Sequence, residues 1–134
     1  MPRGRKRRVK TMNVKKLTNA TKILKEDLGE ALIATDIWAT QDGQSIVGIN
    51  TQPQACALFN RITNYLAEAL KASGFPELGR YYFIDLAENH MVVIIPLGTY
   101  QWGILLDTTK MQLGLLLNVV LPNALTAFTE AAAE

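Results

Sequence analysis

Apolar residues recur along this chain with two different periods. Over residues 14–28 they return at every third or fourth position, which predicts an amphipathic helix. Gly29 follows this helix at once, and glycine readily takes the left-handed conformation that ends helices. Helical spacing returns over residues 53–73, where Pro53 suits a first turn and the pair Thr51 and Gln54 predicts a capping box.

The second helix has two distinct faces. We expect its apolar face to pack on the core and its polar face to meet solvent. The apolar face comprises Ala55, Leu58, Phe59, Ile62, Tyr65, Leu66, Ala69 and Leu70. The polar face comprises Asn60, Arg61, Asn64, Glu68 and Lys71.

Five shorter segments have the composition of strands. Residues 32–40 and 45–50 flank Asp42-Gly43, a dipeptide typical of hairpin turns. Further strands are predicted at 80–87, 91–96 and 101–107. The last two are almost continuously apolar, which indicates a sheet covered on both faces.

A closing helix is predicted from Thr109, with Gln112 completing a second capping box. Pro122 should kink this helix, because its ring clashes with the carbonyl group of Asn118. The predicted order is therefore helix, two strands, helix, three strands, helix.

Charge is distributed unevenly along the sequence. Residues 1–16 hold eight Lys/Arg and no acid, whereas the remaining 118 residues have a net charge of −6. Residues 1–12 also lack apolar periodicity, so we predict a disordered basic tail at 1–12 and a folded domain at 13–134. Nucleic acid, an anionic membrane surface or an acidic partner could bind the tail, which could equally be without function. Its basic residues are Arg3, Arg5, Lys6, Arg7, Arg8 and Lys10.

Residues that could support catalysis are scarce. His90 is the only histidine and falls in a predicted turn, and Cys56, the only cysteine, has no proton acceptor nearby in the sequence. The sequence has neither a phosphate-binding loop nor the spacing of a metal site. We therefore expect no enzyme activity, no cofactor and no small-molecule substrate. A single cysteine and the lack of a secretory signal favour a cytoplasmic location.

The most informative stretch is the aromatic segment Tyr81-Tyr82-Phe83-Ile84-Asp85. If it forms an edge strand, its unpaired backbone needs a cover, which a second copy of the chain would provide. The alternative is an interior strand that is covered within one chain.

Four stretches together resemble the roadblock / dynein light chain family. They are Gln41-Asp42-Gly43 before a short strand, the helix at 53–73, the series Pro96-Leu97-Gly98, Leu105-Leu106-Asp107 and Leu113-Gly114, and the apolar closing helix. Thr40, Pro122, the two tryptophans and the basic tail depart from the family pattern. Trp38 and Trp102 fall on strands that are neighbours in that family, so we expect them to pack inside.

The resemblance implies a profilin-like, three-layer α/β/α domain with a five-stranded antiparallel sheet. The long helix would cover one face, and the first and last helices the other. It also implies a homodimer, or a heterodimer, formed through the edge strand and the long helix. The corresponding interface residues are Tyr81, Tyr82, Phe83, Ile84, Asp85, Asn60, Arg61, Asn64 and Glu68.

Such dimers serve as non-enzymatic adaptors that bind or regulate small Ras-like GTPases, and the resemblance implies that role here. Fold alone is a weak basis for function. The alternative is a structural protein that the basic tail tethers to nucleic acid or to an anionic membrane surface.

Overall fold

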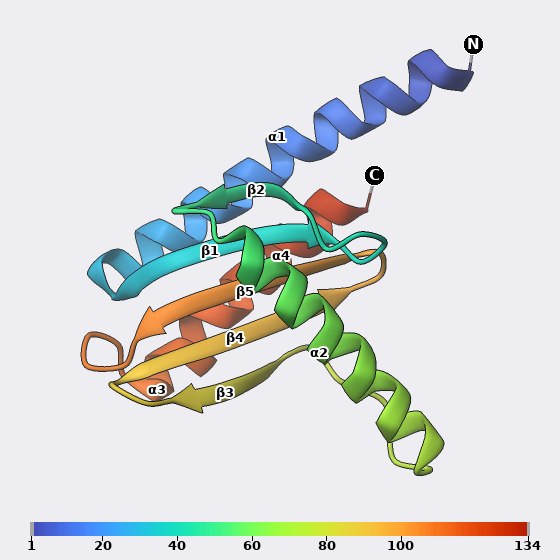
Figure 1. Ribbon diagram of the computed structural model, residues 1–134. Helices are drawn as coiled ribbons and strands as arrows, with labels where there is room; N and C mark the ends of the chain where they lie inside the picture. The colour runs from blue at the N-terminus through green and yellow to red at the C-terminus, as the bar shows by residue number, and fades with distance from the viewer. Residues whose placement is uncertain (1, 134) are drawn as a thin grey trace.

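The computed structural model describes residues 2–133, with side chains from Val14 onward. Its elements follow the predicted order, with two short helical segments added, at Gly29–Ala31 (a 3₁₀ turn) and Leu116–Val120 (a π-helix). The main elements are α1 (Pro2–Leu28), β1 (Leu32–Ala39), β2 (Ser45–Ile49), α2 (Pro53–Ala72), β3 (Tyr82–Leu86), β4 (His90–Leu97), β5 (Tyr100–Asp107), α3 (Leu113–Leu115) and α4 (Leu121–Ala132) (Figure 1).

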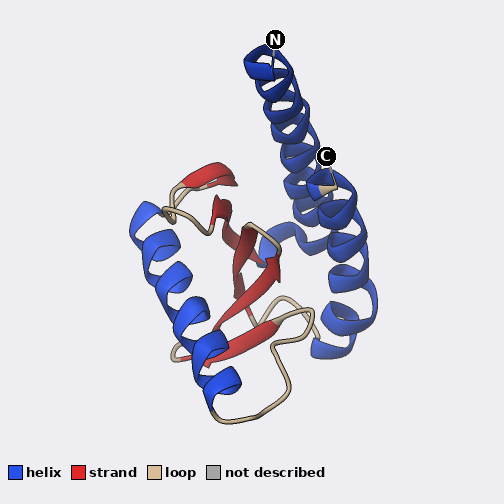
Figure 2. Cartoon of the chain, turned by 90° about the vertical axis from the view of Figure 1, so that its right-hand side faces the viewer, coloured by secondary structure: helices blue, strands red, loops and turns tan. Residues whose placement is uncertain are grey.

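The five strands form one antiparallel sheet in the order β2-β1-β5-β4-β3. Helix α2 lies on one face of this sheet, and α1 and α4 lie together on the other (Figure 2). The predicted three-layer α/β/α arrangement is therefore confirmed, and so is the neighbourhood of β1 and β5.

The larger core lies between the sheet and the pair α1 and α4. Helix α1 buries Leu17, Ala20, Leu24 and Leu28, the three- and four-residue spacing of one helical face. Trp102 lies at the centre, fully buried, and its ring meets that of Phe128 edge-on at a centroid distance of 5.3 Å. Burial of these large apolar side chains is the main stabilising contribution of this layer.

A smaller core lies under α2 and consists of Trp38, Cys56, Val92 and Ile94. A Cβ atom on Gly103 would lie 2.7 Å from the Trp38 ring, so the glycine lets the indole lie flat against β5. Trp38 and Trp102 both pack inside, as predicted. Their side chains lie on opposite faces of the sheet. Trp102 stands directly opposite Ile37 on β1 and shares its face, and the next residue along β1, Trp38, points to the other face.

Both predicted capping boxes are wrong. The N-cap of α2 is Gln52, which makes no side-chain capping hydrogen bond, and its backbone N–H donates to Asp36 Oδ2 at 2.9 Å. The last helical stretch begins at Leu113, not at Thr109, because the Thr109 hydroxyl donates to Asp107 Oδ1 at 2.6 Å. At both starts the acceptor is a carboxylate, which forms the stronger hydrogen bonds. Asp36 is distant from α2 in the sequence, whereas Asp107 lies two residues before Thr109.

Pro122 is the second residue of α4 and lies inside a continuous helical stretch from Leu113 to Ala132, so its missing N–H removes one intrahelical bond. The π-helical segment directly before it absorbs the register change. The disturbance predicted at Pro122 therefore takes the form of a change of helix type.

Helix α1 begins at Pro2 and so extends through the segment predicted as a basic tail. The side chains of its six basic residues lie outside the described part of the chain. The predicted tail at 1–12 and the domain boundary after it stay predictions.

Candidate functional site

Strand β3 is an edge of the sheet and pairs with β4 alone among the described strands. This excludes the interior-strand alternative. The strand begins at Tyr82, two residues later than predicted, so Tyr81 precedes it. One row of backbone N–H and C=O groups on β3 therefore faces outward, which is the arrangement that accepts a further strand.

The side chains of this segment alternate between the two faces of the sheet. Tyr82 packs in the small core on the α2 side, where its hydroxyl oxygen lies 2.7 Å from Thr63 Oγ1. Burial raises the pKa of Tyr82. Tyr81 packs against the core on the opposite side and stacks with Phe83 at 6.4 Å between ring centroids. Phe83 itself stays 41% exposed.

Helix α2 covers the sheet only in part. Its fully buried residues are Cys56 and Thr63 alone, whereas Leu58 is 47% and Tyr65 74% exposed. The prediction that the whole apolar face is buried is therefore wrong. The helix contacts the sheet through Cys56, Asn60 and Thr63, so part of its apolar stripe points to the side of this contact line and stays exposed.

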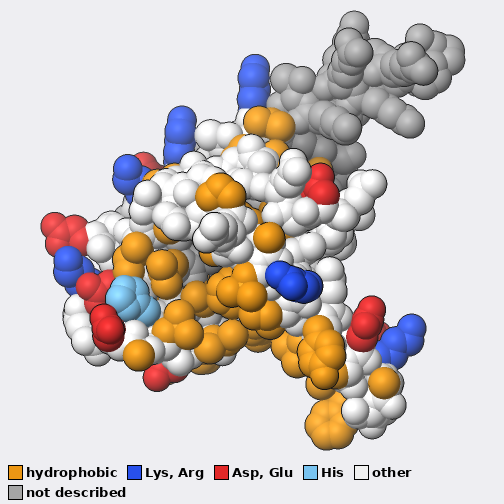
Figure 3. Space-filling view, viewed as in Figure 1, with side chains coloured by type: hydrophobic (Ala, Val, Ile, Leu, Met, Phe, Trp, Pro, Cys, Tyr) orange, Lys and Arg blue, Asp and Glu red, His pale blue; other side chains and the backbone are white. Residues whose placement is uncertain are grey.

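We call this partly exposed stripe the apolar flank of α2. At 100° per residue, its members lie on one side of the line that touches the sheet. Figure 3 shows hydrophobic side chains gathered over the sheet beside α2 and continuing toward the end of that helix. The apolar flank comprises Leu58, Ile62, Tyr65, Leu66 and Ala69.

Asn60 corrects the predicted polar face. Its Nδ2 donates to the carbonyl oxygen of Thr40 at 3.1 Å, and its Oδ1 lies 3.3 Å from Trp38 Nε1. The residue is half-buried and turned toward the sheet, so its amide is used inside the chain. Sequence periodicity placed it with solvent-facing residues because it cannot show where the helix rests.

The other predicted interface residues of α2 are exposed. Asn64 and Glu68 line a hollow of 420 Å³ with Thr40, Pro96 and Gly98, on the side away from the apolar flank. Arg61 is exposed near them on the same helix. The structure thus joins the aromatic edge segment to α2 through Tyr82 and Thr63 and leaves the polar residues on the other flank.

A groove of 180 Å³ opens between the first half of α2 and the sheet. Its wall is almost entirely apolar and reaches from Ala55 and Phe59 on the helix to Leu105 and Leu86 on the strands. Leu86 belongs to β3, so the groove is continuous with the edge strand. Large exposed apolar surfaces of this kind mark protein contacts.

Two polar groups lie beside this groove, and both have structural partners. Asp36 accepts from the Ser45 hydroxyl at 2.8 Å and from the Gln52 backbone, which ties the start of α2 to β1. Burial, and then the Asp36 charge, raise the pKa of Cys56 to about 12. The thiol is therefore protonated at neutral pH and is not a nucleophile.

We expect Cys56 to be inert in the native protein. Labelling by a thiol reagent at pH 7.5 should run about a hundredfold slower than in 6 M urea, because the thiol is 1% exposed and protonated. Rapid native labelling would mean that α2 detaches from the sheet.

The described residues show no catalytic arrangement. They hold no group of three or more metal-ligating side chains. His90 begins β4, and its Nδ1 lies 3.3 Å from the carbonyl oxygen of Ala87. Hydrogen bonds from Thr109 lower the pKa of Asp107, the last residue of β5.

Similarity to known proteins appears at the level of structure. No family model and no curated protein matches the sequence. MglB of Myxococcus xanthus superposes with a TM-score of 0.73 over 87% of each chain, at 16% identity. A roadblock/LC7 domain of Streptomyces avermitilis gives 0.59 over 84% of this chain and 96% of its own, at 8% identity.

The chain has the roadblock/LC7 fold. Profilin IA of Acanthamoeba castellanii matches more weakly, with a TM-score of 0.52 over 81% of this chain and 96% of its own, at 18% identity. The predicted roadblock-type, profilin-like architecture is therefore confirmed. The apolar flank of α2 and the groove beside it were not predicted from the sequence.

The signal for the apolar flank was present as the apolar stripe of α2, but we predicted that the core would bury this stripe.

Proposed function

We propose that this roadblock-fold chain is a non-enzymatic, dimeric adaptor that binds and regulates a small Ras-like GTPase in the cytoplasm. The observation that carries the proposal is the unpaired strand β3 next to the exposed apolar flank of α2. Both are surfaces for protein contact, and nothing in the described residues offers chemistry of its own.

A second copy of the chain fits this surface. Antiparallel pairing of two β3 strands would join the sheets around a twofold axis perpendicular to them. That axis keeps both α2 helices on the same face of the joined sheet, so that each apolar flank can cover the other. Dimerisation would then remove the exposed edge and the exposed apolar surface together.

Charge at the edge strand should weaken this dimer. Phe83→Asp puts a carboxylate beside the joined strands, and we expect the mass measured by light scattering at about 50 µM to fall toward that of a monomer. Gln44→Asp, in the turn before the opposite edge strand β2, is the matched control and should leave the mass unchanged. If the two variants have the same mass, β3 is not part of the dimer interface.

The GTPase role is tested with purified Ras-like GTPases of the source cell. We expect the dimer to bind one of them and to change its rate of GTP hydrolysis or of nucleotide exchange, with the catalytic groups supplied by the GTPase. Calorimetry measures the binding, and release of phosphate and of a fluorescent nucleotide measures the two rates. No binding at 100-fold excess, with both rates unchanged, would contradict the proposal.

A further inference from the structure

The two sides of the molecule carry opposite charge. Helix α1 has ten Lys/Arg and two acids in its sequence, a net charge of +8, whereas the rest of the chain is at −6. The overall value of +2 hides this separation. A surface with so many cations attracts an extended anionic partner.

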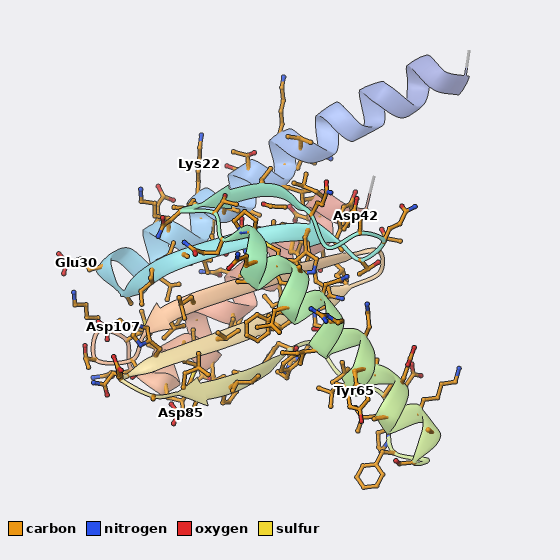
Figure 4. All side chains as sticks on the ribbon, viewed as in Figure 1. Lys22, Glu30, Asp42, Tyr65, Asp85 and Asp107 are labelled. Carbon is orange, nitrogen blue, oxygen red and sulfur yellow. The ribbon has the colours of Figure 1, made fainter. Side chains whose placement is uncertain are left out.

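Among the described residues, α1 presents Lys15, Lys22 and Lys25 to solvent. Figure 4 shows Lys22 extending from α1 away from the sheet. The opposite side of the helix is held in the core by Leu17, Leu24 and other apolar residues. The lysines therefore stand on a face that the fold leaves uncovered.

Helix α4 and the segments before it lie beside α1 in the same layer (Figure 2). Asn123 Nδ2 donates to Asp27 Oδ2 at 3.0 Å across the two helices. The outer side of this C-terminal stretch exposes Leu113, Leu115 and Val119 by 45–51%. No Asp or Glu occurs between Asp107 and Glu130, so this stretch itself adds no repulsive charge. On α1 the acids are the exposed Glu26 and the half-buried Asp27, against ten Lys/Arg in the helix sequence.

The stretch Leu113–Ala132 is long and apolar enough to cross a membrane by length and composition. Its inner side, however, is part of the core, with Leu121, Ala124 and Phe128 all buried. A helix fixed in this way can lie along a bilayer surface without crossing it.

We propose that the outer face of α1 and of the C-terminal stretch docks on an anionic lipid bilayer. The lysines would meet the phosphate and carboxylate headgroups, and Leu113, Leu115 and Val119 would enter the headgroup layer. A nucleic acid fits this face less well, because Tyr65 and Phe75, the most exposed aromatic residues on which bases could stack, lie on and just after α2.

Docking in this way leaves the α2 face directed away from the bilayer. In the dimer proposed above, the twofold axis would put both α1 helices on the same side, so that two basic faces act together. Binding by a single chain does not require the dimer, and the two proposals can fail separately.

The test is sedimentation of the full chain with vesicles of phosphatidylcholine alone or with about one-third phosphatidylserine. We expect binding to the anionic vesicles only, with a loss at high salt. Lys22→Glu/Lys25→Glu should lower the partition coefficient by more than about 30-fold, because the loss of each lysine costs about fivefold and each new carboxylate is repelled by the anionic lipid. Arg61→Glu/Lys71→Glu makes the same change of charge on α2, which lies on the opposite face of the sheet, and should bind like the unmodified chain.

The apolar contact is tested by Leu115→Gln/Val119→Gln, which should weaken binding to anionic vesicles while thermal unfolding confirms the fold. A 20-base-pair DNA duplex is the competing ligand. If the lysine pair and the control pair lower vesicle binding equally, the attraction depends on net charge alone and not on this face, and the proposal is overturned. Tight binding of the duplex, with vesicle binding insensitive to Leu115→Gln/Val119→Gln, would overturn it in favour of nucleic acid.

Discussion

We expect Leu58→Asp to convert the proposed dimer into a monomer. Leu58 lies on the apolar flank of α2, where it is half-exposed in the single chain and would be covered by the partner. The twofold axis puts the new carboxylate into the interface twice, without a cation to pair with it. We expect a loss of about 4 kcal/mol per dimer, which raises the dissociation constant about a thousandfold. Analytical ultracentrifugation over a concentration series measures it.

Asn64→Asp is the matched control, because it adds the same charge to the polar flank of the same helix. It should leave the dissociation constant close to that of the unmodified chain. A monomeric Asn64→Asp together with a dimeric Leu58→Asp would place the interface on the polar flank, with Arg61 and Glu68. Far-UV circular dichroism should show that both variants keep their helices.

Trp102→Ala should cause the largest loss of stability of any single substitution considered. The side chain is fully buried, its Nε1 donates to Thr35 Oγ1 at 2.6 Å, and its ring packs on Phe128. Removing it leaves a cavity between the sheet and α4, which costs about 3–5 kcal/mol. The total free energy of unfolding of a domain of this size is about 5–15 kcal/mol. Thermal unfolding should therefore begin more than about 10 °C lower.

Two further variants separate the contributions. Trp102→Phe keeps a ring next to Phe128 but loses the hydrogen bond to Thr35, which should cost about 1–2 kcal/mol more than the loss of area alone. Lys71→Ala, at an exposed position of α2 away from the apolar flank, should change the free energy of unfolding by less than about 0.5 kcal/mol. Urea denaturation measures the free energy of unfolding of these two variants and of Trp102→Ala. A stable Trp102→Ala protein would show that this core does not hold the sheet to α4.

The surface proposed for the partner follows from how narrowly α2 rests on the sheet. Trp38 fills the space beneath the helix, and its Nε1 lies within hydrogen-bonding distance of both Gln101 Oε1 and Asn60 Oδ1. This bulky support contacts one line of helical residues and leaves the groove open beside it. The same packing that stabilises the small core therefore leaves the apolar flank exposed.

Local chemistry was enough to predict most elements of the fold. Gly43 takes a φ of +69° in the turn between β1 and β2, a conformation that glycine accepts at little cost, so Asp42-Gly43 marked the hairpin. Gly29 likewise follows α1 with a φ of +57°. The alternation and length of apolar runs separated strands from helices. These signals act over a few residues, so they can be read without knowing the rest of the chain.

The start of α2 was less predictable because its hydrogen bond is not local. Gln52 at the start of α2 binds Asp36, which is sixteen residues earlier in the sequence and lies on β1. A capping box assumes that the nearest polar side chain is the acceptor. Once the sheet has formed, a buried carboxylate stands closer and accepts more strongly.

The sequence by itself determined the order of helices and strands, a sheet that is covered on both faces, an aromatic segment suited to an edge and a basic beginning, whereas the three-layer arrangement was implied by the family resemblance. The element order, the covered sheet and the basic beginning depend on composition and on the spacing of apolar residues, which can be read from the sequence alone. Only the tertiary structure decided that β3 is the edge, that Asn60 turns inward, and that Leu58 and Tyr65 remain exposed. A helical wheel shows that a stripe is apolar. What covers the stripe depends on where the helix rests on the sheet, and that is set by residues as distant as Trp38 and Gly103.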